Sequence, residues 1–256
     1  GFLIWGNMHY NYGEAAMGWL NNSNFDGAFH SSRGHTYKHL VAYAESHDEE
    51  RMMRMMLDYG NSSGNYSTKT LSTALGRMEL LSAFLYTIPG PKMLWQFGEL
   101  GYEVGINDPC RVCNKPIRWN YLNNPDRKRL YEVTSDIINM RRTYPVFNSN
   151  NYRYDLGGAT KRINLDGNVN ATVIGNFDVV QQNADPNFQN TGWWYDYLSG
   201  DSINVSNVNA GIPLQPGEYH IYTSQKLEVA GPIGTTEENL FASGFSLYPN
   251  PTNGNL

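Results

Sequence analysis

Three short runs of apolar residues, at 2–5, 40–44 and 93–95, contain no polar residue. Unbroken apolar runs are typical of parallel strands that are covered on both faces, whereas a strand with one face in water alternates apolar and polar residues. We therefore predict three parallel strands in the first part of the chain.

Two longer segments, 67–88 and 125–143, repeat apolar residues at the spacing of an amphipathic helix. Pro89 should end the first helix and Pro145 the second, because proline disfavours the helical conformation of the residue before it. Asn124 is well placed to cap the second helix. This alternation of strands and helices is typical of an α/β barrel or a doubly wound parallel sheet.

The pattern changes in residues 148–228. Apolar and polar residues alternate over 169–177, and two further short segments at 193–198 and 218–223 have the composition of strands. Asp166 is followed by glycine, which is a hairpin signal just before the first of these strands. No long helical pattern occurs there, so we predict an antiparallel β-sandwich domain.

Composition changes at the same place. All nine methionines lie in residues 1–147, which carry a net charge of +1, whereas residues 148–256 carry −6. We therefore place a domain boundary at Phe147. Glycine, proline and polar residues in 229–240 predict a linker, and a new unit begins in 241–256.

The composition of the whole chain excludes some classes of function. The 256 residues have a net charge of −5, so no basic excess is available to bind a nucleic acid. No apolar run approaches the roughly 20 residues that a membrane-spanning helix needs. With 13% aromatic and only 17% charged residues, the surface suits carbohydrate binding, although core packing uses the same aromatic residues.

Seven polar or charged residues follow the apolar run at 40–44, beginning with Glu45, Ser46, His47 and Asp48. In a parallel α/β barrel the active site lies at the carboxyl ends of the strands, which is where these side chains would be. The alternative is a solvated loop that starts a helix, with Ser46 or Asp48 as its N-cap.

Three segments carry a resemblance to the α-amylase family of glycoside hydrolases. Residues 43–48 resemble the family's fourth signature motif, in which a strand ends in a His-Asp pair, and 90–101 resemble its motif on the eighth strand. Residues 115–119 resemble the segment that closes the barrel. The resemblance implies an α/β plus all-β fold, with the C-terminal three strand–helix units of a (β/α)8 barrel in 1–147 and the family's antiparallel β-sandwich in 148–228.

The resemblance also implies roles for single residues. Asp48 would be the family's third catalytic carboxylate, which binds sugar hydroxyls and stabilises the oxocarbenium-like transition state. His47 would donate a hydrogen bond to the same sugar. Glu45 shares a strand face with His47, so it would orient that ring or contact substrate. Tyr12 is a candidate for stacking on a sugar ring.

The family's nucleophile and acid/base carboxylate lie on its fourth and fifth strands, about 5–5.5 Å apart in a retaining enzyme. Neither motif is present in this sequence, and the resemblance places Gly1 near the sixth strand. We therefore expect part of a secreted α-amylase-like enzyme that cleaves α-1,4-glucosidic bonds of starch-like glucans with retention, inactive by itself. No cofactor is identified, and calcium binding by the longer protein is left open.

Two other functions remain open at this point. The string at 44–48, Ala-Glu-Ser-His-Asp, is also similar to that of α-1,4-glucan branching enzymes, which transfer the glycosyl unit to a sugar hydroxyl instead of water. A branching enzyme or glucanotransferase is therefore the alternative enzyme. A non-catalytic glucan-binding surface protein is the alternative of another class.

Cys110 and Cys113 are the only cysteines of the chain. A zinc site would need two further ligands at suitable spacing, and a thioredoxin-like motif would need a helix start where a proline follows. A short-loop disulfide is the simplest interpretation in an exported protein.

Residues 245–254 include Tyr-Pro-Asn-Pro followed by glycine. This segment resembles the beginning of the C-terminal sorting domain that the bacterial type IX secretion system uses. The resemblance implies a bacterial protein that is secreted or held at the cell surface, with the secretion machinery as a partner in addition to an α-glucan.

Overall fold

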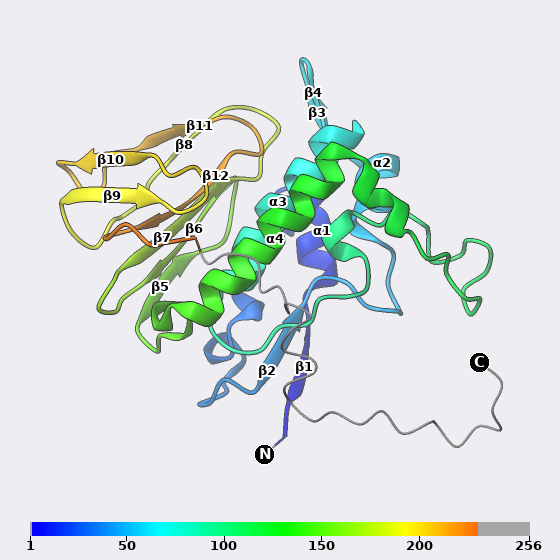
Figure 1. Ribbon diagram of the computed structural model, residues 1–256, viewed down its shortest axis with the longest axis horizontal. Helices are drawn as coiled ribbons and strands as arrows, with labels where there is room; N and C mark the ends of the chain where they lie inside the picture. Colours follow the sequence, from blue (N-terminus) through cyan, green and yellow to red (C-terminus); the bar gives the residue numbers. More distant parts are fainter. Residues whose placement is uncertain (1, 230–256) are drawn as a thin grey trace, which may run out of the picture.

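The computed structural model describes residues 2–229. The sorting segment and nearly all of the predicted linker lie outside this described range. A parallel strand pair and four α-helices form one lobe, and an antiparallel β lobe follows (Figure 1). The helices are α1 His9–Met17, α2 Met52–Tyr59, α3 Leu71–Thr87 and α4 Pro125–Thr143.

The parallel pair consists of β1, Ile4–Asn7, and β2, Leu40–Tyr43, which confirms two of the predicted strands. At the third apolar run there is only a single parallel bridge, between Ala42 and Lys92, the residue just before the run. Pro91 accepts a hydrogen bond from Ala42 but has no N–H to extend the ladder, and the chain turns again at Trp95. The strand predicted at 93–95 is therefore reduced to this bridge.

Both predicted helices are present. The Oδ1 atom of Asn124 accepts hydrogen bonds from the N–H groups of Asp126 and Arg127, at 3.0 and 3.1 Å, which confirms the predicted cap of α4. The other helix, α3, begins at Leu71, four residues later than predicted. A small hairpin, β3 Ser62–Ser63 with β4 Tyr66–Ser67, occupies the start of that prediction.

The β lobe has a six-stranded antiparallel sheet and a separate two-stranded sheet. The predicted hairpin at Asp166 connects β6 to β7, and Leu165 pairs with Ala171 there. In spatial order the six strands are β10 Ser202–Val205, β9 Gly192–Asp196, β12 Tyr219–Thr223, β7 Ala171–Asn176, β6 Thr160–Leu165 and β5 Tyr152–Asp155. The two-stranded sheet pairs β8 Gln182–Ala184 with β11 Ile212–Leu214.

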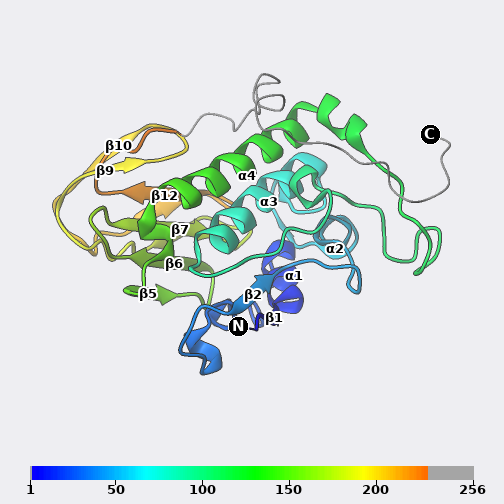
Figure 2. The same cartoon turned by 60° about the horizontal axis from the view of Figure 1, so that its bottom comes forward.

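The six-stranded sheet lies between two layers. On one face, Trp194, Phe188 and Leu214 belong to a small apolar cluster shared with the β8–β11 pair. On the other face the sheet packs against α3, as Figure 2 shows. A Cβ at Gly175 of β7 would lie only 2.5 Å from Leu80 Cδ1, so a glycine is needed for this close approach of strand and helix.

The two lobes share one hydrophobic core. Phe25, which follows α1, contacts Phe84 of α3 and Phe177, which follows β7, with ring centroids 6.3 and 5.2 Å apart. Phe84 and Phe177 are themselves in edge-to-face contact at 5.1 Å. The core therefore continues across the position of Phe147, where the composition of the chain changes.

Two buried cations also connect the lobes. The guanidinium of Arg77 donates hydrogen bonds to the carbonyls of Ala15, Ala16 and Phe177, at 2.5 to 2.7 Å. Ala15 and Ala16 lie in the last turn of α1, where carbonyl groups lack the regular partners of the helix interior. The other cation is Lys161 of β6, whose ammonium donates a hydrogen bond to Ser23 Oγ in the other lobe. Among the described residues no helix is both long and apolar enough to span a membrane.

Candidate functional site

The polar segment after β2 lines a pocket of about 370 Å³. Its other walls are Trp95 and the loop of residues 102–115, which comes from much later in the chain. Pockets of this size lie within the range of small-molecule sites. The lining side chains used below are His47, Asp48, Arg51, Trp95, Arg111 and Lys115.

His47 and Asp48 are the exposed pair at the mouth of this pocket. Their side chains are each 70% exposed, and His47 Nε2 lies 3.4 Å from Asp48 Oδ2. The ring of Trp95 lies 5.6 Å from the His47 ring, centroid to centroid. An exposed carboxylate, an imidazole and an indole ring can together accept, donate and stack, which is the chemistry that a sugar requires.

Glu45 does not take part in this exposed group. Its side chain is 8% exposed, and Oε2 accepts a hydrogen bond from Arg51 Nη2 at 3.0 Å. Oε1 accepts another at 2.7 Å from the backbone N–H of Met52, the first residue of α2. Both oxygens are thus engaged inside the protein, so the prediction that Glu45 contacts substrate is corrected to a structural role at the helix N-terminus.

The segment is a loop that leads into α2, as the alternative prediction had it, but the capping role predicted for Ser46 or Asp48 is wrong. Helix α2 has Arg51 at its N-cap position, and no side chain caps it from there. Ser46 instead accepts a hydrogen bond from the Asp48 N–H at 3.2 Å, in a local turn ahead of the helix. The Asp48 carboxylate, 70% exposed, is therefore accessible to a ligand.

Tyr12 lies in the hydrophobic core and not at the pocket. It is fully buried, and its ring stacks on Phe25 at 4.0 Å with an interplanar angle of 11°. Burial raises the pKa of its hydroxyl, which finds no hydrogen-bond partner among residues 2–229. The expectation that Tyr12 stacks on a sugar is therefore incorrect. The Tyr12 ring packs in the hydrophobic core against Phe25 instead.

The disulfide loop forms the opposite wall of the pocket. Cys110 and Cys113 are joined by a disulfide with their Cα atoms 5.2 Å apart. Arg111, inside this small loop, donates from Nη2 to the backbone carbonyl of Asp48 at 2.8 Å. The backbone N–H of Ile106 donates to Glu50 Oε1 at 2.9 Å. Two hydrogen bonds thus fix the loop to the segment that carries Asp48.

Lys115 organises the loop from within. Its ammonium donates to the carbonyl groups of Gly105, Ile106, Asp108 and Cys110, at 2.5 to 3.2 Å. An ammonium has three protons, so four carbonyls share them and converge on one point. The roles of Lys115 and Arg111 cannot be predicted from the sequence, because only the folded loop brings together the carbonyls that they bind.

A second carboxylate, Glu99, lies behind the pocket. Burial raises its pKa, against the opposing effects of its backbone hydrogen bond and of Arg51. Its Oε2 atom is buried without a hydrogen-bond partner among the described residues. Within that part of the chain no group of three His, Cys, Asp or Glu side chains is arranged to hold a metal ion.

Comparison with solved structures shows a shared fold. An α-amylase from Anoxybacillus matches 86% of this chain and 46% of its own, with a TM-score of 0.63 at 16% sequence identity. AmyP in complex with maltose matches 89% and 50%, with a TM-score of 0.63 at 13% identity. CldA, a cyclomaltodextrin glucanotransferase, matches 86% and 44%, with a TM-score of 0.61 at 14% identity.

The chain spans about half the length of these solved structures. No protein-family model and no curated protein matches the sequence. The similarity therefore concerns the fold, at identities too low to carry an activity from one protein to another.

Proposed function

We propose that this chain is part of an α-amylase-type glycoside hydrolase that acts on α-1,4-glucans of the starch type with retention of configuration. The observation that carries the proposal is the exposed His47–Asp48 pair at the carboxyl end of a parallel strand, in a chain that shares the fold of α-amylases. AmyP has been crystallised with maltose and with maltotriose, and such oligosaccharides are the ligands we propose here.

In this proposal Asp48 accepts hydrogen bonds from two sugar hydroxyls, and His47 donates to the same ring. The negative charge of Asp48 gains in effect as positive charge develops on the sugar, so it lowers the barrier more than it stabilises the bound substrate. Trp95 supplies an aromatic surface beside His47. Residues 1–256 contain no recognisable nucleophile or acid/base motif, so we propose that the chain alone does not turn over glucan.

A glucanotransferase or branching enzyme is the second candidate. The string Ala-Glu-Ser-His-Asp at 44–48 favours it, and one of the similar structures is a cyclomaltodextrin glucanotransferase. The difference lies in the acceptor, which is water in one case and a sugar hydroxyl in the other. Analysis of the products decides between them, because only transfer forms new glucosidic bonds.

We further propose that the protein is exported by a bacterium, with residues 241–256 leading to the secretion machinery. The disulfide between Cys110 and Cys113 supports this proposal, since such bonds persist mainly outside the cytosol. Blocking accessible thiols before and after reduction would test the oxidation state in protein taken from the culture medium.

The decisive experiment measures amylose hydrolysis by the full-length enzyme and by its Asp48→Asn variant. We expect kcat to fall by about 10²-fold or more, the scale observed when one transition-state partner is removed. Asp58→Asn is the matched control, because Asp58 is a surface carboxylate of α2 paired with Arg54. If Asp48→Asn retained most of the wild-type kcat, the proposed role of Asp48 would be wrong.

A further inference from the structure

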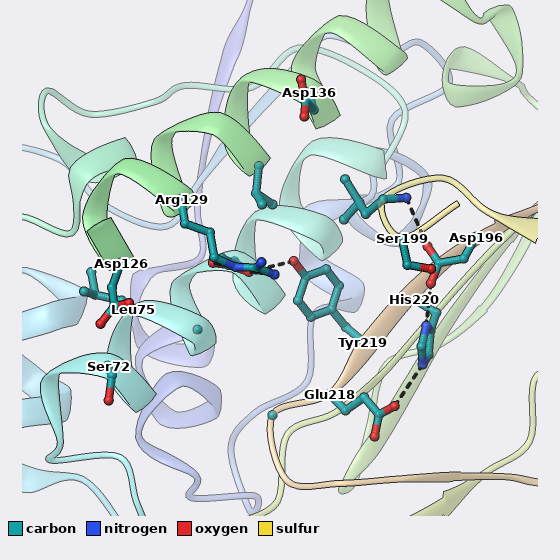
Figure 3. A pocket seen from close by; sticks show the side chains of 15 residues that line it. Ser72, Leu75, Asp126, Arg129, Asp136, Asp196, Ser199, Glu218, Tyr219 and His220 are labelled. Atoms are coloured by element: carbon teal, nitrogen blue, oxygen red, sulfur yellow. Dashed lines mark hydrogen bonds and ion pairs between the residues drawn. The ribbon is translucent and has the colours of Figure 1, made fainter. Parts of the chain in front are cut away.

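A second and larger pocket lies between the two lobes, away from His47 and Asp48. Its volume is about 590 Å³, well inside the range of ligand sites. Helices α3 and α4 form one wall, and the β lobe forms the other (Figure 3). The residues that line it include Gly76, Glu79, Arg129, Asp136, Tyr219 and His220.

One side of this pocket is built around a paired carboxylate. Glu79 is nearly buried, and its two oxygens accept hydrogen bonds from Arg129 Nε at 3.0 Å and Nη2 at 3.3 Å. The hydroxyl of Tyr219, from the opposite lobe, donates to the same carboxylate at 3.1 Å. Arg129 therefore neutralises the charge of Glu79 inside the pocket. The two parallel hydrogen bonds also fix the orientation of the planar Arg129 guanidinium.

The other side is built around a paired imidazole. His220 Nδ1 lies 2.6 Å from Asp196 Oδ2, and its Nε2 lies 3.1 Å from Glu218 Oε1. Burial lowers the pKa of His220, but the hydrogen bonds and charges of Asp196 and Glu218 outweigh burial and raise it. Figure 3 shows the ring of Tyr219 between this group and Arg129.

Two further carboxylates, Asp126 and Asp136, extend from α4 toward the same space. Among the described residues neither carboxylate accepts a hydrogen bond. The free groups of the pocket are thus mainly acceptors, while its buried charges are already paired with one another. A neutral ligand rich in hydroxyl donors fits this arrangement, because its hydroxyls can donate to the free carboxylates without disturbing the existing pairs, whereas an anion would be repelled. A cation is the competing ligand class, because the two free carboxylates would attract it.

Gly76 leaves part of the pocket wall without a side chain. It lies in the interior of α3, where glycine is unfavourable compared with alanine. A Cβ at this position would meet no atom within 4 Å, and the backbone there does not need a glycine conformation. Packing therefore does not require Gly76, and its effect is to expose the helix backbone to whatever enters the pocket.

We propose that the pocket between α3, α4 and the β lobe binds a neutral sugar, as a second carbohydrate site separate from the one at Asp48. The ring of Tyr219 offers a stacking surface, and the acceptors of α4 receive the sugar hydroxyls. The choice of an α-glucan as the sugar rests on the proposed function.

Calorimetric titration of the full chain with maltotriose tests this inference. We expect binding that survives Asp48→Ala and that Gly76→Leu weakens at least tenfold, because the leucine side chain would occupy the pocket. Lys128→Leu is the matched control, since it places the same side chain on an exposed part of α4 outside the pocket. Thermal unfolding should show that Gly76→Leu remains folded, because a Cβ at this position meets no atom within 4 Å and the rest of the side chain extends into the open pocket.

The possible results separate the two sites. Binding that is lost in Asp48→Ala but unchanged in Gly76→Leu would mean that only the Asp48 pocket takes sugar, and the inference would be overturned. It would also be overturned if no maltotriose bound to Asp48→Ala, whatever the activity of the full-length enzyme. If spermidine bound in a way that Gly76→Leu abolished, while maltotriose did not, the ligand class would be cationic and the inference wrong.

Discussion

The ammonium of Lys161 lies 4.8 Å from the centroid of the Phe25 ring. Lys161 belongs to β6 in the β lobe, and Phe25 follows α1 in the other lobe. The ammonium also donates to Ser23 Oγ at 3.1 Å and to the carbonyl of Leu156 at 2.9 Å. A fully buried lysine is thus held at the junction of the lobes by an aromatic face and by neutral acceptors, without a hydrogen-bonded carboxylate.

This position makes stability depend on pH. Burial lowers the pKa of Lys161 from 10.5 to about 7, against the smaller opposing effects of Asp155 and Asp26. The unfolded chain therefore binds more protons between those two values, and the free energy of unfolding should rise as pH increases from 7 to 10.5. Denaturant unfolding of the wild type and Lys161→Met at pH 6 and pH 9 should show the stability of the wild type, relative to that of the variant, rising by at most about 3 kcal/mol, because only the two pH units above the folded pKa contribute. Parallel curves at the two pH values would contradict this.

His220 should have the opposite dependence. Its pKa is raised in the folded protein, so the stability it contributes is present below the ordinary value of 6.5 and is lost as pH rises through the folded value. We expect His220→Gln to cost about 1.5–3 kcal/mol at pH 5.5 and less at pH 9, the scale of a hydrogen bond to a charged group. Thermal unfolding of both proteins at each pH checks this prediction. An equal loss of stability at both pH values would show that the positive charge of the imidazole does not contribute to stability.

Glu45→Gln should act on stability and not on sugar affinity. The substitution leaves the buried guanidinium of Arg51 without its charged partner, and breaking a buried pair in this way costs about 3–5 kcal/mol. The exposed pair of Arg54 and Asp58 is the control, since Asp58→Asn should cost about 0.5 kcal/mol or less. Urea denaturation measures both. A stable Glu45→Gln protein with weakened maltotriose binding would restore Glu45 as a substrate contact.

Lys115→Met should loosen the disulfide loop. Four carbonyls lose their common donor, and hydrophobic methionine of similar length cannot replace it. We expect faster limited proteolysis within residues 102–115 and a several-fold weaker affinity of the Asp48 pocket for maltotriose, with little change in the melting temperature. Lys128→Met, at an exposed site of α4, is the control. Unchanged cleavage and affinity would show that the loop is held by its other contacts alone.

Local signals in the sequence predicted much of the fold. The cap at Asn124 and the stop at Pro145 define α4 because they act within one helical turn, and the hairpin at Asp166 depends on adjacent residues. The prediction of a strand at 93–95 was wrong because the local composition does not show whether a neighbouring strand offers backbone hydrogen-bond partners along the whole segment. Long-range pairing decides that, and it is a property of the folded chain.

The candidate site was predicted less completely. His47 and Asp48 are recognisable because they follow a buried strand directly, and the structure places them at a pocket. Tyr12 and Glu45 were assigned to that pocket from residue type and spacing, but burial and pairing decide their roles. Neither burial nor pairing can be predicted from adjacent residues. Tyr12 contacts Phe25, and Glu45 contacts Arg51, only in the folded chain.

The ring contacts among Phe25, Phe84 and Phe177 bear on how this protein could be recombined with others. An antiparallel β lobe that follows a helical lobe in the chain invites exchange between proteins as a separate module. Here a cut after Phe147 would leave Phe177 on one piece and its two aromatic partners on the other, and would uncover the face of Gly175. Chimeras should therefore carry α3 together with the β lobe, because the close packing between them has to be transferred intact.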